Sequence, residues 1–310
     1  MFDRASRLER RFRQIGQELE PLALQAEDQS GLLTLEQELF TGARAHRFLG
    51  YYSEKGILTA LDAYGISAAL RPKGIPKLII RCILDDPSHH RVLIYKSAKA
   101  TPDDLLVDLA LHVAAGVEVA HVSQRSPVRL LVIDWLMLQD PRLPPDNSNL
   151  FPGQKHPGLG LGMEFGALLG QIARRLHLDG LLTYPAWYHN AAFYQLRYQY
   201  LNPVVQGGFE ALQQDLGELE QITASWAVEL GCVLEHQAVE NSPTGQLTHV
   251  LSWQGRPMLW PHAPVLAALF DRPAWRGARD AMRAGVHYSV DWDRLKRLRP
   301  GLPTTGSGGK

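Results

Sequence analysis

The chain reads Val128-Arg129-Leu130-Leu131-Val132-Ile133-Asp134-Trp135-Leu136-Met137-Leu138 near its middle. This almost unbroken run of β-branched and aliphatic side chains is typical of a strand that is buried on both faces in the centre of a sheet. We therefore expect the fold to be organised around this strand.

A polar, proline-rich stretch follows, and three glycines then alternate with leucines in residues 158–162. Apolar residues recur at helical spacing directly afterwards, from Phe165 to Leu176. The glycines thus stand where a loop becomes a helix, and the unpaired N–H groups and positive dipole end of a helix start favour an anion. Because glycine lacks a Cβ, a phosphate can approach the main chain. The loop is a candidate diphosphate cradle, although tight turns and close packing also use glycine.

A short strand is expected next at Leu181–Tyr184, and His189-Asn190-Ala191-Ala192-Phe193-Tyr194 then opens another helix. This order of strand, glycine loop, helix, strand and helix resembles the GNAT acyltransferase superfamily, whose pyrophosphate loop Gly158, Gly160 and Gly162 match. Pro157 stands where that family usually has Arg or Gln, and the spacing from Asn190 to Tyr194 is shorter than in the family.

The resemblance implies an enzyme that transfers an acyl group from acyl-coenzyme A to a small-molecule or peptide amine by direct attack, with no metal. Its alternative is a GNAT-like module that binds a ligand or a protein without catalysis. The resemblance also assigns the site residues. The coenzyme would be bound by Gly158, Leu159, Gly160, Leu161, Gly162 and Asn190, and Tyr194 would be the general acid that protonates the thiolate.

Each catalytic candidate has a structural alternative. Asp134 interrupts an apolar strand, where a buried carboxylate must be paired or have a raised pKa, so it is a candidate base. It could equally form a salt bridge or lie at a sheet bulge. Tyr194 could be a core aromatic beside Phe193 and Tyr198, and Asn190 could be a helix N-cap.

The expected fold class is α/β (α+β): a mixed, mainly antiparallel GNAT-like sheet flanked by helices. Short polar turns between the apolar runs of residues 77–138 favour an antiparallel meander. The expected domains are a helical segment (1–75), the GNAT-like domain (76–202), a helix and hairpin extension (203–299) and a disordered tail (300–310). The expected helices cover residues 2–22, 34–52, 57–64, 162–176, 189–194, 203–230 and 274–284, and the expected hairpin joins residues 233–239 to 249–253.

The 310 residues contain 32 Lys plus Arg and 32 Asp plus Glu, so no overall charge attracts nucleic acid or an anionic membrane. No apolar run is long enough to cross a bilayer, and Cys82 and Cys232 are expected to be free thiols. These features favour a cytoplasmic protein with no nucleic-acid or membrane partner; a homo-oligomer is left open.

Four histidines stand in expected loops or turns: His89, His90, His156 and His189. They are not paired on one helix face, so the sequence does not predict a metal site. His156 and His189 could flank one cleft, where either could serve in acid–base chemistry.

Overall fold

The computed structural model describes residues 2–26, 47–86, 88–115, 128–145, 150–238 and 246–302. Its contacts divide the chain into two compact units. Unit 1 comprises Met1–Val117, Pro127–Pro144 and His156–Leu181, and unit 2 comprises Glu118–Ser126, Pro145–Lys155 and Leu182–Lys310. The division groups residues by their contacts and does not test where domains begin and end. The expected domain boundaries therefore stay predictions.

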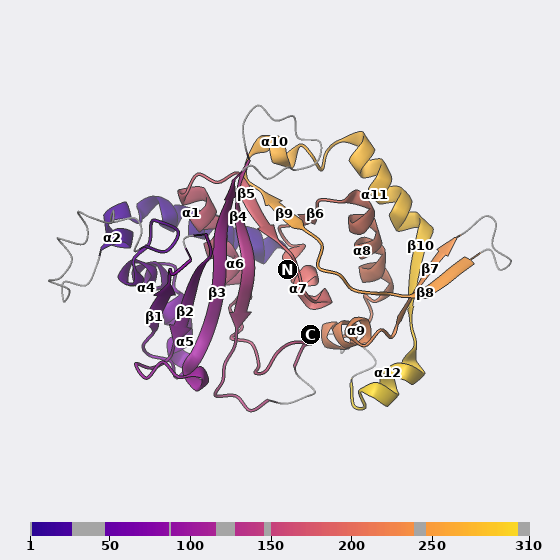
Figure 1. Cartoon of the computed structure of the whole chain (residues 1–310), viewed down its shortest axis with the longest axis horizontal. Helices are drawn as coiled ribbons and strands as arrows, with labels where there is room; N and C mark the ends of the chain where they lie inside the picture. The colour runs from indigo at the N-terminus through magenta and orange to yellow at the C-terminus, as the bar shows by residue number, and fades with distance from the viewer. Residues whose placement is uncertain are drawn as a thin grey trace. The chain divides into compact units, whose positions relative to one another are not determined.

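The sheet of unit 1 is the expected meander. Four strands follow one another as antiparallel neighbours, and Figure 1 shows them side by side: β1 (Ile79–Ile83), β2 (His90–Tyr95), β3 (Leu105–Ala115) and β4 (Arg129–Leu138). The next strand in the sheet is β5 (Gly180–Thr183), within which the two units divide. The run at 128–138 is therefore a central strand, and the mainly antiparallel α/β architecture is confirmed.

The burial of the central strand changes along its length. Leu130, Leu131, Val132 and Ile133 are all buried, whereas Asp134 and Trp135 are exposed. The prediction that this strand is buried on both faces holds only for its first half, because the apolar run is broken at Asp134.

Helices pack around this sheet: α1 (Phe2–Glu18), α2 (Pro21–Gln25), α4 (Glu54–Ala63), α5 (Ile66–Leu70), the 3-10 turn η1 (Arg71–Lys73) and α6 (Gly162–Arg175). Figure 1 shows α6 behind the strands, and α1 packs against α6. The rings of Phe12 and Tyr64 lie 4.7 Å apart in this layer. Ser53 is the N-cap of α4, and its side chain accepts a hydrogen bond from the backbone N–H of Gly56.

One expected helix of this region is partly wrong. Residues 34–46 lie outside the described residues. Residues 47–52 form a tight turn with a β-bridge between Phe48 and Tyr52. Leu49 and Gly50 have positive φ angles of 54° and 67°, which a helix excludes.

Unit 2 continues from β5, with β9 (Met258–Pro261) next to it and β6 (Gln199–Tyr200) paired antiparallel to β9. A second sheet has the order β10 (Val286–Val290), β7 (Val233–Ala238) and β8 (Gln246–Val250). The antiparallel pair of β7 and β8 confirms the expected hairpin. The other elements are α7 (Tyr188–Tyr194), α8 (Pro203–Asp215), α9 (Gln221–Glu229), α10 (Pro264–Ala267), α11 (Pro273–Gly285) and α12 (Trp292–Leu298).

The expected single helix over residues 203–230 is wrong, because it is two helices. Helix α8 ends at Asp215 and α9 begins at Gln221. Apolar residues nevertheless continue at helical spacing across the break, at Leu212, Leu216, Leu219 and Ile222.

Cys82 and Cys232 are free thiols, as expected. Among the described residues, no helix combines the length and the apolar character needed to cross a bilayer. The expected disordered tail lies outside the described residues beyond Leu302.

Candidate functional site

In the glycine-rich loop the leucines are buried and two of the glycines are exposed to solvent. Leu159 and Leu161 are 1% and 4% exposed, whereas Gly158 and Gly160 are exposed. Helix α6 begins at Gly162. The buried leucines therefore anchor the loop to unit 1, and the main chain at the two outer glycines faces solvent.

The residue at the N-cap of α6 has no side chain that could cap the helix. Leu161 is the N-cap residue and provides no side-chain hydrogen bond to the helix start. A Cβ added to Gly158 would meet only the carbonyl oxygen of Leu138, at 3.7 Å. Gly160 has a φ of +71°, a conformation that disfavours every residue with a Cβ. The N–H groups of the first helical turn are thus not satisfied by a capping side chain.

A lysine that the sequence analysis did not single out lies beside this loop. The ammonium group of Lys73 donates a hydrogen bond to the carbonyl oxygen of Leu159. Its Nζ is 3.4 Å from the position that a Cβ of Gly160 would take. Lys73 comes from the η1 turn, far from the loop in sequence, so no local pattern could have identified it.

The loop is also connected to a buried carboxylate that is paired with an arginine. Asp140 accepts hydrogen bonds from Arg142 Nε at 2.8 Å and Nη2 at 2.7 Å. These bonds hold the pKa of Asp140 below its usual range. The backbone N–H of Asp140 donates to the carbonyl oxygen of Pro157 at 2.7 Å, and Arg142 also donates to the carbonyl oxygen of Lys73. Arg142 therefore balances the buried carboxylate and holds the turn that carries Lys73.

An acidic residue in the first turn of α6 has a cationic neighbour. Glu164 lies 3.8 Å from the guanidinium group of Arg4 on α1. A carboxylate in the first turn of a helix is favoured by the helix dipole, and this position next to α1 gives it a partner.

The expected acid and amide ligand lie on α7, in unit 2. Asn190 is not the N-cap of this helix, because Trp187 is. Tyr194 packs among aromatic rings, with its ring centroid 5.3 Å from that of Tyr198. Burial raises the pKa of Tyr194 to about 12, while a hydrogen bond with Thr183 acts in the opposite direction. The phenol is therefore protonated at neutral pH.

The carboxylate of Asp134 was expected to be buried, but it is partly exposed. Its side chain is 30% exposed, and its Oδ2 lies 2.7 Å from Nδ1 of His112 on β3. Both structural alternatives for Asp134 are found. It forms an ion pair when His112 is protonated, and it is the extra residue of a bulge, since Ala110 pairs with Trp135 and Leu111 with Ile133.

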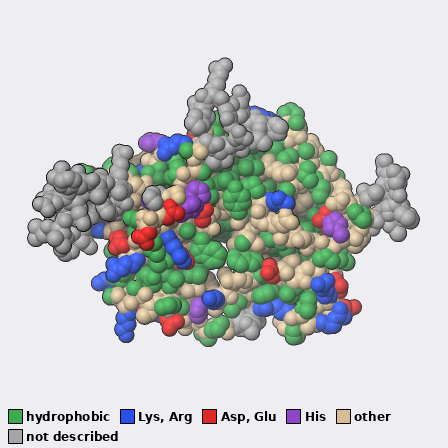
Figure 2. Space-filling view, in the orientation of Figure 1, with side chains coloured by type: hydrophobic (Ala, Val, Ile, Leu, Met, Phe, Trp, Pro, Cys, Tyr) green, Lys and Arg blue, Asp and Glu red, His purple; other side chains and the backbone are tan. Residues whose placement is uncertain are grey.

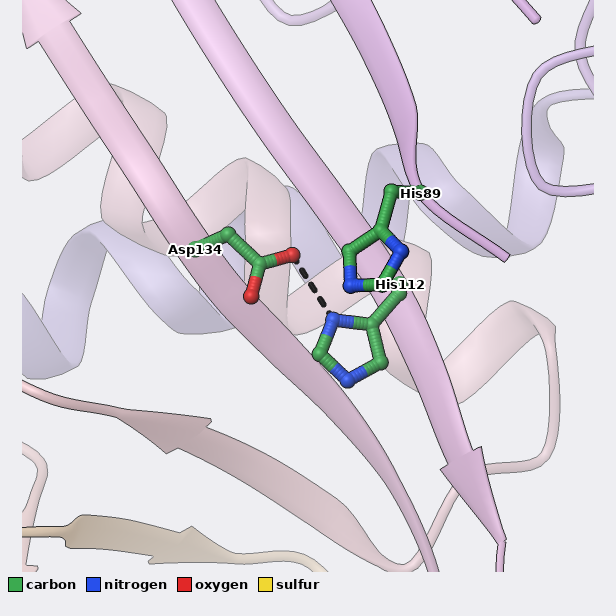
Figure 3. A group of neighbouring side chains, drawn as sticks. All are labelled: His89, His112 and Asp134. Atoms are coloured by element: carbon green, nitrogen blue, oxygen red, sulfur yellow. Dashed lines mark hydrogen bonds and ion pairs between the residues drawn. The ribbon is translucent and has the colours of Figure 1, made fainter. Parts of the chain in front are cut away.

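His89 joins this pair on the exposed face of the sheet. The rings of His89 and His112 have centroids 4.7 Å apart. Figure 2 shows histidine and acidic side chains gathered over β3 and β4, and Figure 3 shows His89, His112 and Asp134 turned toward one another. The sequence analysis named His89 and Asp134 separately and missed His112.

Nδ1 of His90 accepts a hydrogen bond from the backbone N–H of Leu49 at 2.6 Å. His156 and His189 lie in different units. Nδ1 of His156, in unit 1, is buried without a hydrogen-bond partner among the described residues, and so is Nδ1 of His189, in unit 2. His189 stacks on Phe151 with centroids 4.6 Å apart, and burial lowers its pKa to about 4. His189 is therefore neutral at physiological pH, and whether both histidines flank one cleft stays a prediction.

A scan against protein-family models, a search of curated proteins and a search of solved structures each find no match to this chain.

Proposed function

We propose that this chain binds acyl-coenzyme A at the glycine-rich loop and transfers the acyl group to an amine. The observation that carries the proposal is the solvent-facing main chain at Gly158 and Gly160, directly before the uncapped start of α6, with the ammonium group of Lys73 beside it. This is a suitable set of groups for the diphosphate of a coenzyme.

The binding chemistry is electrostatic. N–H groups of the first turn of α6 would donate to phosphate oxygens, and the helix dipole favours an anion there by about 0.3 to 2 kcal/mol. Lys73 uses one donor on the carbonyl of Leu159. An ammonium group has about three donors, so two remain for a phosphate.

The transfer step needs little from the protein besides orientation. The amine nitrogen attacks the thioester carbonyl carbon; a C–N bond forms, the C–S bond breaks, the amine loses a proton and the thiolate gains one. Holding the amine against the thioester supplies much of the rate. Tyr194 and Asp134 stay the predicted acid and base of this step.

A binding module without catalysis is the second candidate. Two observations favour it: the Asp134 carboxylate already has a partner in His112, and Tyr194 is packed among aromatic rings. The same loop would then hold a phosphorylated or coenzyme-like ligand without turnover.

Two experiments separate these candidates. The first is thermal unfolding with coenzyme A and acetyl-coenzyme A, where a hundredfold excess over Kd should add about 2.7 kcal/mol of stability. The second is release of free thiol from acetyl-coenzyme A with a panel of amines. Stabilisation with amine-dependent thiol release supports the enzyme. Stabilisation alone supports the binding module. No stabilisation rejects the enzyme and removes coenzyme A as the ligand of the binding module.

A further inference from the structure

Three side chains on the exposed face of the unit 1 sheet converge on one point. His89, His112 and Asp134 each offer one ligand atom, and these atoms all lie within 4.8 Å of one another. Figure 3 shows the three side chains in front of the strands, with the dashed line marking the contact between His112 and Asp134. Two imidazoles and a carboxylate are a donor set that binds divalent transition metals.

The sheet itself produces this convergence. The antiparallel register pairs His90 with Leu111, which places His89 opposite His112. On the other side of β3, the bulge leaves Asp134 outside the regular ladder. Bulges of this kind redirect a side chain, and here the redirected carboxylate reaches His112.

The turn between β1 and β2 orients the first imidazole. Nδ1 of His89 lies 3.1 Å from the hydroxyl oxygen of Ser88 and 3.3 Å from Oδ2 of Asp86. Ser88 in turn donates to Asp86 from its hydroxyl at 2.5 Å and its N–H at 2.8 Å. With Nδ1 engaged by this turn, Nε2 of His89 is free to coordinate an ion. A carboxylate behind a ligating histidine is the usual way in which proteins orient such a ligand.

We propose that His89, His112 and Asp134 bind a divalent transition-metal ion of the zinc class, with Asp86 as the partner that orients His89. Zinc–ligand distances of about 2.0 to 2.2 Å in a tetrahedron separate two ligands by roughly 3.3 Å. The contact between His112 and Asp134 is 2.7 Å, so it has to open only slightly to admit the ion. Three protein ligands leave a fourth position for water. With an ion bound, Asp134 would be a ligand and could not act as the base of acyl transfer, whereas coenzyme binding at the glycine-rich loop does not involve this cluster.

The test uses the full chain without a polyhistidine tag, stripped of metal and titrated with Zn²⁺ by calorimetry. We expect one equivalent to bind to the wild type. His89→Asn, His112→Gln and Asp134→Asn should each weaken binding by more than about 100-fold, and Asp86→Asn by about 10- to 100-fold. His177→Asn is the matched control, because His177 is an exposed histidine of the same unit with a φ of 53°, which Asn tolerates. It should bind Zn²⁺ as the wild type does.

A second measurement needs no variant. Carbethoxylation of His89 and His112, mapped by mass spectrometry, should fall with one equivalent of Zn²⁺ while that of His177 is unchanged. Absence of stoichiometric Zn²⁺ binding, or binding that the three ligand variants retain, would show that His112 and Asp134 form only an ion pair and would overturn the proposal.

Discussion

Lys73 donates a hydrogen bond from its ammonium group to the carbonyl oxygen of Leu159, at the centre of the glycine-rich loop. The η1 turn and the loop are thus joined by a cation at the point where the main chain is open. If a diphosphate binds there, Lys73 should contribute directly to its affinity.

Removal of this charge should weaken coenzyme binding. Lys73→Met should raise the Kd for acetyl-coenzyme A by about tenfold, since a hydrogen bond to a charged group contributes about 1.5 kcal/mol. The effect should shrink with added salt because the side chain is exposed. Lys77→Met, at another exposed lysine of unit 1, is the control and should leave the Kd unchanged. Equal Kd values for both variants would remove Lys73 from the site.

Two glycine substitutions in the loop should have different effects on stability. Gly160→Ala places a Cβ at a φ of +71° and should cost about 1 kcal/mol of unfolding free energy. Gly158→Ala makes only an ordinary 3.7 Å contact and should leave the unfolding midpoint unchanged. Its methyl group should nevertheless obstruct the cradle, so the acetyl-coenzyme A affinity should fall. Unchanged affinity in Gly158→Ala would mean that the ligand does not approach this main chain.

Gly56 allows two helices of unit 1 to approach closely. A Cβ there would lie 1.8 Å from the carbonyl oxygen of Leu24, so Gly56→Ala should destabilise the fold by about 3 kcal/mol or more. Gly277 on α11 has nothing within 4 Å of its Cβ position, and Gly277→Ala should stabilise by about 1 kcal/mol. Denaturant unfolding of both variants checks these signs; similar midpoints would contradict the close approach of α2 and α4.

Burial of His189 should make the protein less stable in weak acid. Its pKa falls from 6.5 to about 4 because the ring is buried. Between these two values the unfolded chain binds a proton that the folded chain does not, so stability is lost as the pH falls from 6.5 toward 4. His189→Phe can keep the stack on Phe151 and should reduce this loss by up to about 3 kcal/mol. Parallel pH–stability curves for the wild type and the variant would refute this assignment.

The strands were predictable because their apolar runs are long and the turns between them are polar and short. The run at 128–138 and the hairpin at 233–250 follow from such local patterns. The break between α8 and α9 was not predictable, because Leu216, Leu219 and Ile222 keep the helical spacing of apolar residues through it. The two-residue strand β6 is too short to give a periodic signal.

The glycine loop was predictable as a loop-to-helix junction, but its cationic neighbour was not. Lys73 precedes Leu159 by 86 residues, and only the packing of η1 against the loop brings them together. The cluster of His89, His112 and Asp134 was likewise not predictable, because its members are far apart in the sequence. Its formation depends on strand register and on a bulge at Asp134, and local sequence patterns predict neither of these.

Calorimetric titration of the full chain with acetyl-coenzyme A tests the central claim most directly. One equivalent should bind with a Kd between about 1 μM and 1 mM, and inorganic pyrophosphate should compete. Absence of binding, or binding that pyrophosphate does not affect and that persists unchanged in Gly158→Ala, would contradict a diphosphate site at the head of α6.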